Sequence, residues 1–292
     1  MRTFEEYNPM VTAVYFLTVS GIVMFCRNPV LLLTSLFGAL LYYFMRNKLH
    51  NAKTHLFSLG LFLVMILINP LVSHNGVTVL FLINHNPITL EATVYGIASG
   101  VMVLAVLYWF SSFTQLMTSD KLLYLFGKLS PKLALVLSMG LRYVPLFSKQ
   151  TVKINQTQTA LGLYKDDNII DRYKGGLRVF SVMITWALEN GIITADSMTA
   201  RGYGIGKRSH FSLFRFRRSD ITLLGIVTAL FAFTLISIGS GAVDFAYYPA
   251  IQGTDLSPSA LLGYLSYGIL TLLPAIIEAE EKFKWKYLQS KI

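Results

Sequence analysis

The chain has 292 residues, of which 54% are hydrophobic and only 14% are charged. Soluble domains carry about 25% charged residues, so this composition excludes a soluble globular protein. The single cysteine, Cys26, excludes an intramolecular disulfide and a cluster of thiolate metal ligands. The composition is typical of an all-α, polytopic membrane protein whose main surroundings are the lipid bilayer.

Six apolar segments are expected to cross the membrane as helices. They cover residues 10–26, 30–44, 56–72, 91–113, 221–238 and 258–276. Several are close to the shortest length that crosses about 30 Å of hydrocarbon. The chain begins with a polar stretch, and no small-residue cleavage site follows the first apolar segment. We therefore expect this segment to be an uncleaved anchor rather than a signal peptide.

The distribution of positive charge predicts the orientation in the membrane. The net charge is +10, and all of the 25 Lys and Arg residues except Arg27 fall in segments that are inside when the N-terminus is inside. This asymmetry follows the positive-inside rule for an even number of spans, so it gives no reason to expect a nucleic-acid partner. We expect a multi-pass protein of the prokaryotic cell (inner) membrane, with both termini in the cytoplasm.

The segment between the third and fourth spans contains no Lys or Arg and is expected outside. Its turn-forming residues flank a short apolar run, residues 77–83, which is too short to span and is expected to be a re-entrant or interfacial piece. Thr89 is expected to cap the fourth helix, and Glu91 in the first turn complements the helix dipole.

Two long helices outside the spans are expected after the fourth span. Residues 118–128 predict a short helix in the interface plane, with lysines at the edges of its apolar face. Ser130 and Pro131, a side-chain cap and a first-turn proline, then begin the first long helix. A polar break at residues 165–168 leads into the second. The chain therefore divides into N-terminal transmembrane helices (1–113), a cytoplasmic region with two long helices (114–218), and a C-terminal transmembrane hairpin with a basic tail (219–292).

Two stretches resemble chemical motifs but do not satisfy them. Residues 202–208 look like a phosphate loop, yet they lack the required spacing and the preceding strand, so this chain is not expected to bind ATP. Asp166, Asp167 and Asp171 resemble one aspartate-rich magnesium motif of membrane prenyltransferases, but no second motif faces them. A charged turn that caps the next helix is the favoured interpretation, and we expect no catalytic and no metal-ligating residues.

The tripeptide Ala200-Arg201-Gly202 is by itself an ordinary helix C-terminus, with a basic residue in the last turn and a glycine after it. The sequence motifs that precede and surround this tripeptide make it a specific signal. The arrangement of residues 141–145, 158–162, 189–190 and 195–204, with residues 86–91 and 118–121 before them, resembles the T component of energy-coupling factor (ECF) importers of vitamins and metals, the EcfT/CbiQ family.

The resemblance implies a transmembrane scaffold that is not an enzyme and binds no cofactor. Its expected partners are two ABC-type ATPase subunits, which bind the ATP, and a separate substrate-binding S component. In this family each of two coupling helices ends in an Ala-Arg-Gly-like motif that docks in an ATPase. The second motif matches fully at Ala200, Arg201 and Gly202, whereas the first has Leu161 in place of arginine between Ala160 and Gly162.

The resemblance therefore implies docking by packing at Leu161 and docking through the guanidinium at Arg201. Four further residues are expected to support these contacts: Arg142, Gln158, Glu189 and Asp196. Two other functions remain open as alternatives, a membrane-embedded prenyltransferase that uses the aspartate-rich loop and a stand-alone channel or transporter. The stand-alone transporter would need ionisable residues within its spans, and the predicted spans hold almost none away from their ends. The S component would select the transported substrate.

Overall fold

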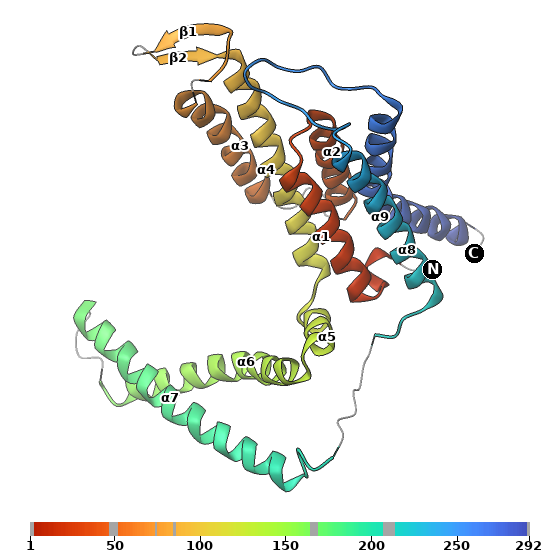
Figure 1. The fold of residues 1–292 in the computed structure, drawn as a ribbon. Coiled ribbons are helices and arrows are strands. Elements are labelled where there is room, and N and C mark those ends of the chain that lie inside the picture. The colour runs from red at the N-terminus through yellow and green to blue at the C-terminus, as the bar shows by residue number, and fades with distance from the viewer. Residues whose placement is uncertain are drawn as a thin grey trace. The chain divides into compact units, whose positions relative to one another are not determined.

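The computed structural model describes residues 3–46, 52–73, 75–83, 86–163, 169–206 and 214–290, and these are mostly helical (Figure 1). The chain forms two compact units. Met1–Leu122 and Phe214–Ile292 form the first, here named the bundle unit, and Leu123–Leu213 form the second, named the helix-pair unit.

The bundle unit contains six long apolar helices, a short 3-10 helix and a β-hairpin. In chain order its elements are η1 (Phe4–Glu6), α1 (Pro9–Phe25), α2 (Pro29–Arg46), α3 (Ala52–Val72), β1 (Val79–Ile83), β2 (Asn86–Thr89), α4 (Leu90–Leu116), the beginning of α5 (Ser119–Leu129), α8 (Arg218–Gly239) and α9 (Pro258–Gln289). Within the described residues, five of these helices are long and apolar enough to cross a membrane, namely α2, α3, α4, α8 and α9. The apolar α1 is shorter, with 17 residues. These six helices lie where the sequence predicts six spans.

Capping groups begin these helices at the expected places. Asn8 accepts a hydrogen bond from the backbone N–H of Met10 at 3.0 Å, and Pro9 follows at the first helical position. Thr89 caps α4 by accepting from the N–H of Ala92 at 3.3 Å, which confirms the prediction. The buried carboxylate of Glu91 accepts from the backbone N–H of Thr78, so it fastens the hairpin to α4.

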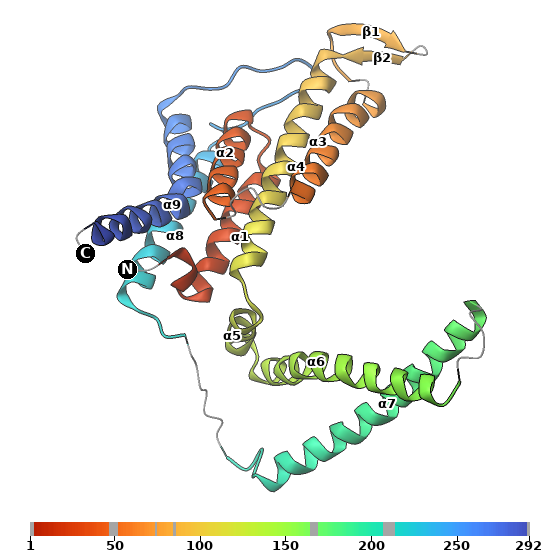
Figure 2. The same ribbon diagram turned by 180° about the vertical axis from the view of Figure 1, so that it is seen from behind.

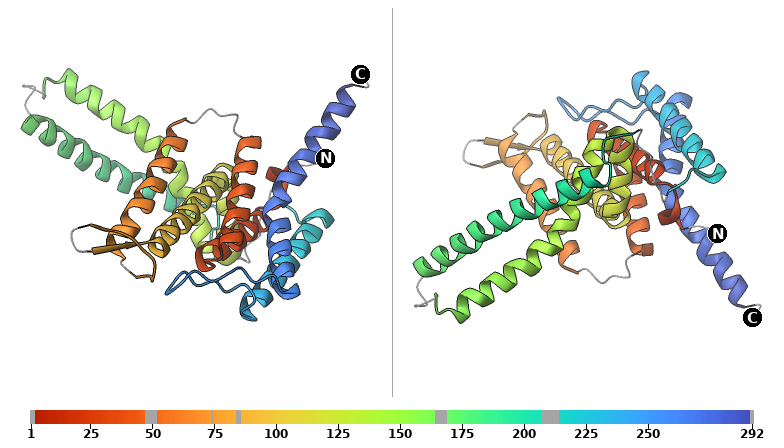
Figure 3. Two further views of the ribbon diagram at one scale, coloured as in Figure 1. Left: turned by 90° about the horizontal axis from the view of Figure 1, so that it is seen from above. Right: turned by 90° about the horizontal axis from the view of Figure 1, so that it is seen from below.

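An aromatic cluster forms the centre of the bundle unit. The buried Trp109 of α4 donates from Nε1 to the hydroxyl of Ser35 on α2 at 3.0 Å. Tyr15 and Phe16 of α1 pack edge-on against its ring, with centroid separations of 6.0 and 5.8 Å. The hydroxyl of Tyr15 donates to the carbonyl of Leu270 on α9 at 3.1 Å. The cluster therefore joins α1, α2, α4 and α9, whereas α3 packs mainly on α4 (Figure 3).

A close contact between small groups brings α2 and α9 together. A Cβ added at Gly38 would lie 2.8 Å from Cβ of Thr271 and 3.0 Å from its backbone oxygen. Small residues let membrane helices approach closely, and lipid supplies no hydrophobic force that would hold them together otherwise. The absence of a side chain at position 38 therefore sets the distance between these two helices.

The apolar run between α3 and α4 forms a β-hairpin, which the sequence analysis did not predict. β1 and β2 pair antiparallel, with Phe81 opposite Ile88 and Leu82 opposite Pro87. Neighbouring side chains on β1 point to opposite faces, yet both Phe81 and Leu82 are apolar and exposed. The run therefore lacks the apolar and polar alternation by which a strand is recognised. The re-entrant or interfacial position expected for residues 77–83 stays a prediction, because the hairpin does not fix its depth in a membrane.

The β-hairpin lies at one end of the bundle unit, and α4 ends at the other (Figures 1 and 2). At one end, named the hairpin end, Tyr247 donates to the carbonyl of Arg27 at 2.8 Å, and Arg27 lies 5.7 Å over the ring of Tyr95. The opposite end, named the basic end, carries Arg46 and Lys121. The segments that the sequence analysis places inside and outside thus gather at separate ends.

α9 continues farther than the predicted span, to Gln289 rather than to residue 276. Pro274 lies inside it, and Figures 1 and 2 show that the turns after this region run crosswise to the first part of the helix. Proline bends a helix because it removes one backbone hydrogen bond and crowds the preceding turn. The last part of α9 therefore leaves the bundle sideways.

The helix-pair unit is formed by α6 (Pro131–Ala160) and α7 (Ile169–Ala200), which run antiparallel. The hydroxyls of Tyr143 and Thr194 lie 3.0 Å apart, and the ring of Phe147 packs edge-on against Trp186 at 5.7 Å. Pro131 takes the first position of α6 as predicted. The prediction of a side-chain cap by Ser130 is wrong: its N–H bonds back to Phe126 at the end of α5, and its hydroxyl makes no capping bond.

We predict that Gly38→Ala destabilises the protein, because the new methyl group forces α2 and α9 apart. Overpacking of this kind costs about 1–3 kcal/mol. Gly21→Ala in α1 is the matched control, since its Cβ would meet nothing within 4 Å. Thermal unfolding of both purified variants in detergent checks this. A Gly38→Ala midpoint equal to that of the control would contradict the close contact.

Candidate functional site at two helix ends

α6 ends in a backbone motif that fixes the chain direction after its last turn. Gly162 has a positive φ of +66°, a conformation that glycine adopts without steric cost. Its N–H donates to the carbonyl of Thr159 at 3.0 Å, and the N–H of Leu163 donates to the carbonyl of Gln158 at 3.1 Å. These two bonds define a Schellman motif, which pairs carbonyls that the helix would otherwise leave unpaired.

α7 ends in the same motif. Gly202 has a φ of +79°, and its N–H donates to the carbonyl of Thr199 at 2.9 Å. The N–H of Tyr203 donates to the carbonyl of Met198 at 3.0 Å. The hydrogen bonds correspond one to one with those at the end of α6. Leu161 and Arg201 therefore occupy equivalent positions, each directly before the left-handed glycine.

The side chains at both ends are exposed. Leu161 is 70% exposed and Arg201 is also exposed, and the flanking Ala160 and Ala200 cover neither of them. Ile205, just beyond the second end, is 87% exposed. Exposed apolar side chains next to a fixed backbone are typical of a surface that binds another protein. Each helix end is thus a rigid, uncovered contact point.

The four supporting residues differ in their surroundings. Gln158 is buried beneath the first motif, with 7% of its surface exposed, and its Oε1 has no partner among the described residues. Asp196 and Glu189 are exposed on the last turns of α7. Arg142 is exposed on the middle of α6, about 27 Å of helix from Ala160, so it lies far from the first end. Its neighbour Tyr143 contacts Thr194, about 10 Å of helix before Arg201, so Arg142 lies closer to the second end.

The two helix ends lie apart. α6 ends near the beginning of α7, and α7 then runs for 32 residues, about 48 Å, before it reaches Ala200. Along α6, Phe147 packs on α7, whereas Leu161 beyond the last turn is exposed. The arrangement offers two separate contact points of equal backbone shape and different chemistry.

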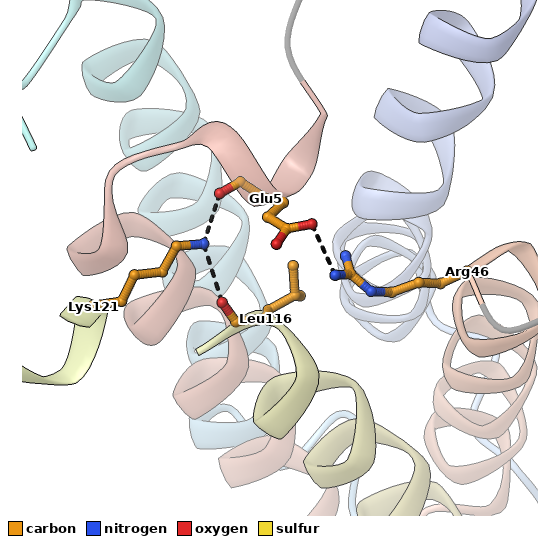
Figure 4. A network of polar contacts seen from close by, with 4 residues as sticks. All are labelled: Glu5, Arg46, Leu116 and Lys121. Atoms are coloured by element: carbon orange, nitrogen blue, oxygen red, sulfur yellow. Dashed lines mark hydrogen bonds and ion pairs between the residues drawn. The ribbon is translucent and has the colours of Figure 1, made fainter. Parts of the chain in front are cut away.

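The first turn of α5, where the bundle unit leads toward the helix pair, is held by a buried lysine (Figure 4). Nζ of Lys121 donates to the carbonyl of Glu5 at 2.7 Å and to the carbonyl of Leu116, at the end of α4, at 3.1 Å. The carboxylate of Glu5 in turn pairs with the guanidinium of Arg46 at 2.9 Å. One network therefore joins η1, α2, α4 and α5.

Sequence analysis missed this network and expected the lysines at the edges of an interfacial helix. Lys121 is instead 6% exposed. Burial lowers the pKa of its ammonium group, and Arg46 lowers it further, while the nearby Glu5 acts in the opposite direction. No pattern in the local sequence distinguishes Lys121 from an exposed lysine, because both partners are backbone carbonyls and one of them, that of Glu5, belongs to a distant segment.

Two features from the sequence analysis add no chemistry to this region. Asp166, Asp167 and the rest of the polar break lie outside the described residues. The glycine-rich stretch after Arg201 follows a helix rather than a strand, unlike a phosphate loop. Within the described ranges, no three His, Cys, Asp or Glu side chains gather as metal ligands would.

The fold and the two helix ends define an all-α, multi-pass membrane protein that carries a pair of long helices outside its apolar spans. The chain belongs to the CbiQ family, described as cobalt transport protein, whose model matches residues 2–213. This match includes both helix ends and the Lys121 network. The prediction of the EcfT/CbiQ family is confirmed.

Similar relatives are proteins named "Energy-coupling factor transporter transmembrane protein EcfT". The one from Listeria innocua is 30% identical over 151 residues, which cover 46% of this chain and 57% of the relative. The one from Lacticaseibacillus paracasei is 31% identical over 107 residues, 36% of this chain and 40% of the relative. The chain thus spans about half of the length of the curated relatives that it matches.

We predict that Lys121→Met destabilises the protein, because methionine fills the space but leaves the carbonyls of Glu5 and Leu116 without this donor. Losing a buried partner of this kind costs about 1–3 kcal/mol. Lys132→Met, at an exposed lysine, is the control. Thermal unfolding in detergent measures both, and a Lys121→Met protein as stable as the control would show that the network is dispensable.

Proposed function

We propose that this chain is the transmembrane coupling subunit of an ECF-type importer for vitamins or metal ions. The observation that carries the proposal is the pair of equivalent Schellman ends, each with one exposed side chain. In the proposal these ends pass the motion of the ATPases to the membrane helices. The printed name of the relatives, which describes a transmembrane protein of an energy-coupling factor transporter, supports this role.

Each proposed partner has a separate task in transport. Two ABC-type ATPase subunits bind and hydrolyse ATP, each holding one helix end, and a separate S component selects the substrate. This chain is then a scaffold without a catalytic residue or cofactor of its own. An importer of this design suits a chain that offers two separated contact points and whose bundle is filled by its own aromatic side chains.

The C-terminal ends of α6 and α7 suit binding grooves of different chemistry on the two ATPases. The planar guanidinium of Arg201 can bind a carboxylate through two parallel hydrogen bonds, which the point charge of lysine cannot reproduce. Leu161 offers only apolar surface, so it suits a groove without a buried charge. Gln158, buried under the first end, would keep the backbone there in place, while Asp196 and Glu189 offer acidic contacts near the second end.

The proposal places the basic end of the bundle in the cytoplasm of a prokaryotic cell, together with both termini and the helix pair. Lysines and arginines are retained on the cytoplasmic side during insertion. The gathering of Arg46 and Lys121 at one end, with the hairpin at the other, is the arrangement that this orientation needs. The ATPases are cytoplasmic, so the contact points must be on this side.

We predict that Arg201→Glu releases one ATPase and abolishes uptake, since it places like charges in contact and leaves a partner's carboxylate unpaired. Breaking a desolvated pair costs about 3–5 kcal/mol. Arg201→Lys should retain only part of the activity, and Arg178→Glu, at an exposed arginine of the same helix, should retain all of it. Leu161→Met should be tolerated, whereas Leu161→Asp should not.

The measurement is purification of each variant with its ATPases, followed by ATP-dependent uptake in proteoliposomes. Retention of both ATPases and of full uptake by Arg201→Glu would reduce the second motif to a helix cap and remove the coupling assignment.

We predict that cysteines at Asn75 and Gln252, in a Cys26→Ser background, react with an impermeant thiol reagent in intact cells. A cysteine at Gln156 on α6 should react only after the membrane is permeabilised. All three positions are exposed, so accessibility within the protein does not limit the reaction. Labelling at position 156 in intact cells would reverse the proposed orientation.

A further inference from the structure

The last two turns of α9 carry a concentration of lysines and exposed aromatic side chains. Residues 282–289 contain Lys282, Lys284 and Lys286 and no acidic residue. Three aromatic residues alternate with these lysines: Phe283 is 74% exposed, Trp285 is 63% exposed and Tyr287 is 61% exposed. Exposed aromatic rings at this density are unusual for a surface that faces only water. We name residues 282–289 the basic aromatic segment.

The segment is fixed to the bundle on one side. Nζ of Lys282 donates to the carbonyl of Met45, near the end of α2, at 2.6 Å. Lys282 and Trp285 also line a cavity of about 1160 Å³ together with Arg46, and Phe283 and Lys286 lie along the same cavity, whereas Lys284 and Tyr287 do not line it. This contact places the beginning of the segment beside the basic end of α2. The side of the helix that carries Lys282 is therefore the side turned toward the bundle.

A second side of the helix, centred about 120° from Lys282, has the pattern of an interfacial helix. At about 100° per residue, Phe283 and Tyr287 lie on one stripe, more than 90° around the helix from Lys282. Lys284 and Lys286 flank this stripe at about 80° on either side. Lysines in such positions can bury their stems along apolar surface and keep the ammonium groups at the level of lipid headgroups. Lys284 also pairs with Glu280, but an exposed pair one turn apart is weak and exchanges readily.

The direction of α9 brings this stripe to the membrane. The first part of α9 is a predicted span, and the turns after Pro274 run crosswise to it and leave the bundle sideways (Figures 1 and 3). We expect an amphipathic helix that turns away from a span in this manner to lie along the membrane surface. Tyrosine and tryptophan concentrate at this level because one end of the ring is apolar and the other is polar.

We propose that the basic aromatic segment lies in the interface of the membrane leaflet at the basic end and binds the headgroups of anionic phospholipids. The assignment is independent of the proposed coupling function, because the family match ends at residue 213 and the segment lies beyond it. Lys284 and Lys286, which flank the stripe in a segment without an acidic residue, suit phosphate groups, and the Phe283–Tyr287 stripe suits the upper acyl chains. The segment would anchor α9, and with it the end of α2.

The test uses the full chain in lipid nanodiscs and an environment-sensitive fluorophore. In the Cys26→Ser background, NBD is attached to a cysteine at position 287, on the stripe, or at position 289, on the side of Lys282. Nanodiscs contain phosphatidylcholine alone or with one quarter phosphatidylglycerol. We expect the emission at position 287 to shift to the blue with phosphatidylglycerol, and the emission at position 289 to remain close to that in water.

The lysines are tested by Lys284→Gln with Lys286→Gln. Each lysine near an anionic surface strengthens binding severalfold, so this pair should lower the ratio of bound to free segment by about thirtyfold. High salt should act in the same direction. Lys149→Gln with Lys153→Gln on α6 removes the same charge from exposed positions of α6 and should leave the emission unchanged.

Three outcomes would overturn the proposal. Emission typical of water at position 287 in both kinds of nanodisc would mean that the stripe does not enter the interface. An equal blue shift with and without phosphatidylglycerol would remove the headgroup specificity. A shift that appears only when other proteins co-purify with the chain would assign the stripe to a protein partner instead.

Discussion

The carbonyl groups at the ends of helices constrain this structure more than any other feature. Each helix leaves carbonyls without intrahelical partners, and lipid cannot supply donors. The chain supplies them itself: Lys121 reaches back five residues to the end of α4, whereas Lys282 reaches the end of α2 and Tyr247 reaches the carbonyl of Arg27 from distant segments. The same groups that satisfy the backbone therefore also hold one helix to the next.

The two units solve the problem of helix association differently. In the bundle, the Trp109–Ser35 hydrogen bond and the approach of Gly38 to Thr271 bring helices together through polar and small groups. In the helix pair, a few aromatic contacts around Phe147 join two helices that are otherwise largely exposed. A long helix with little burial depends on its caps, which is consistent with the complete Schellman motifs at the C-terminal ends of α6 and α7.

The sequence predicts what depends on local pattern and misses what depends on distant partners. Apolar length locates the six helices, and the capping residue Thr89 marks the beginning of α4 because its bond is local. The hairpin was missed because β1 is apolar on both faces. The sequence predicts a helical span only to residue 276, whereas α9 continues to Gln289. The charged turns after the span resemble a polar tail, although Glu, Lys and Ala favour helix. The sequence predicts that helices end at Leu161 and Arg201. The equivalence of the two ends depends on backbone hydrogen bonds and on the φ angles of Gly162 and Gly202, which no sequence pattern shows.

That identity has a consequence for how this chain can change over time. Leu161, directly before Gly162, has φ −78° and ψ 1°, angles that many side chains adopt without strain, and Arg201 holds the equivalent position before Gly202. A substitution at either of these two positions can therefore change the surface chemistry without changing the backbone conformation. A single nucleotide change can alter which protein surface is preferred while the fold stays intact, so specificity can drift at one helix end without affecting the other.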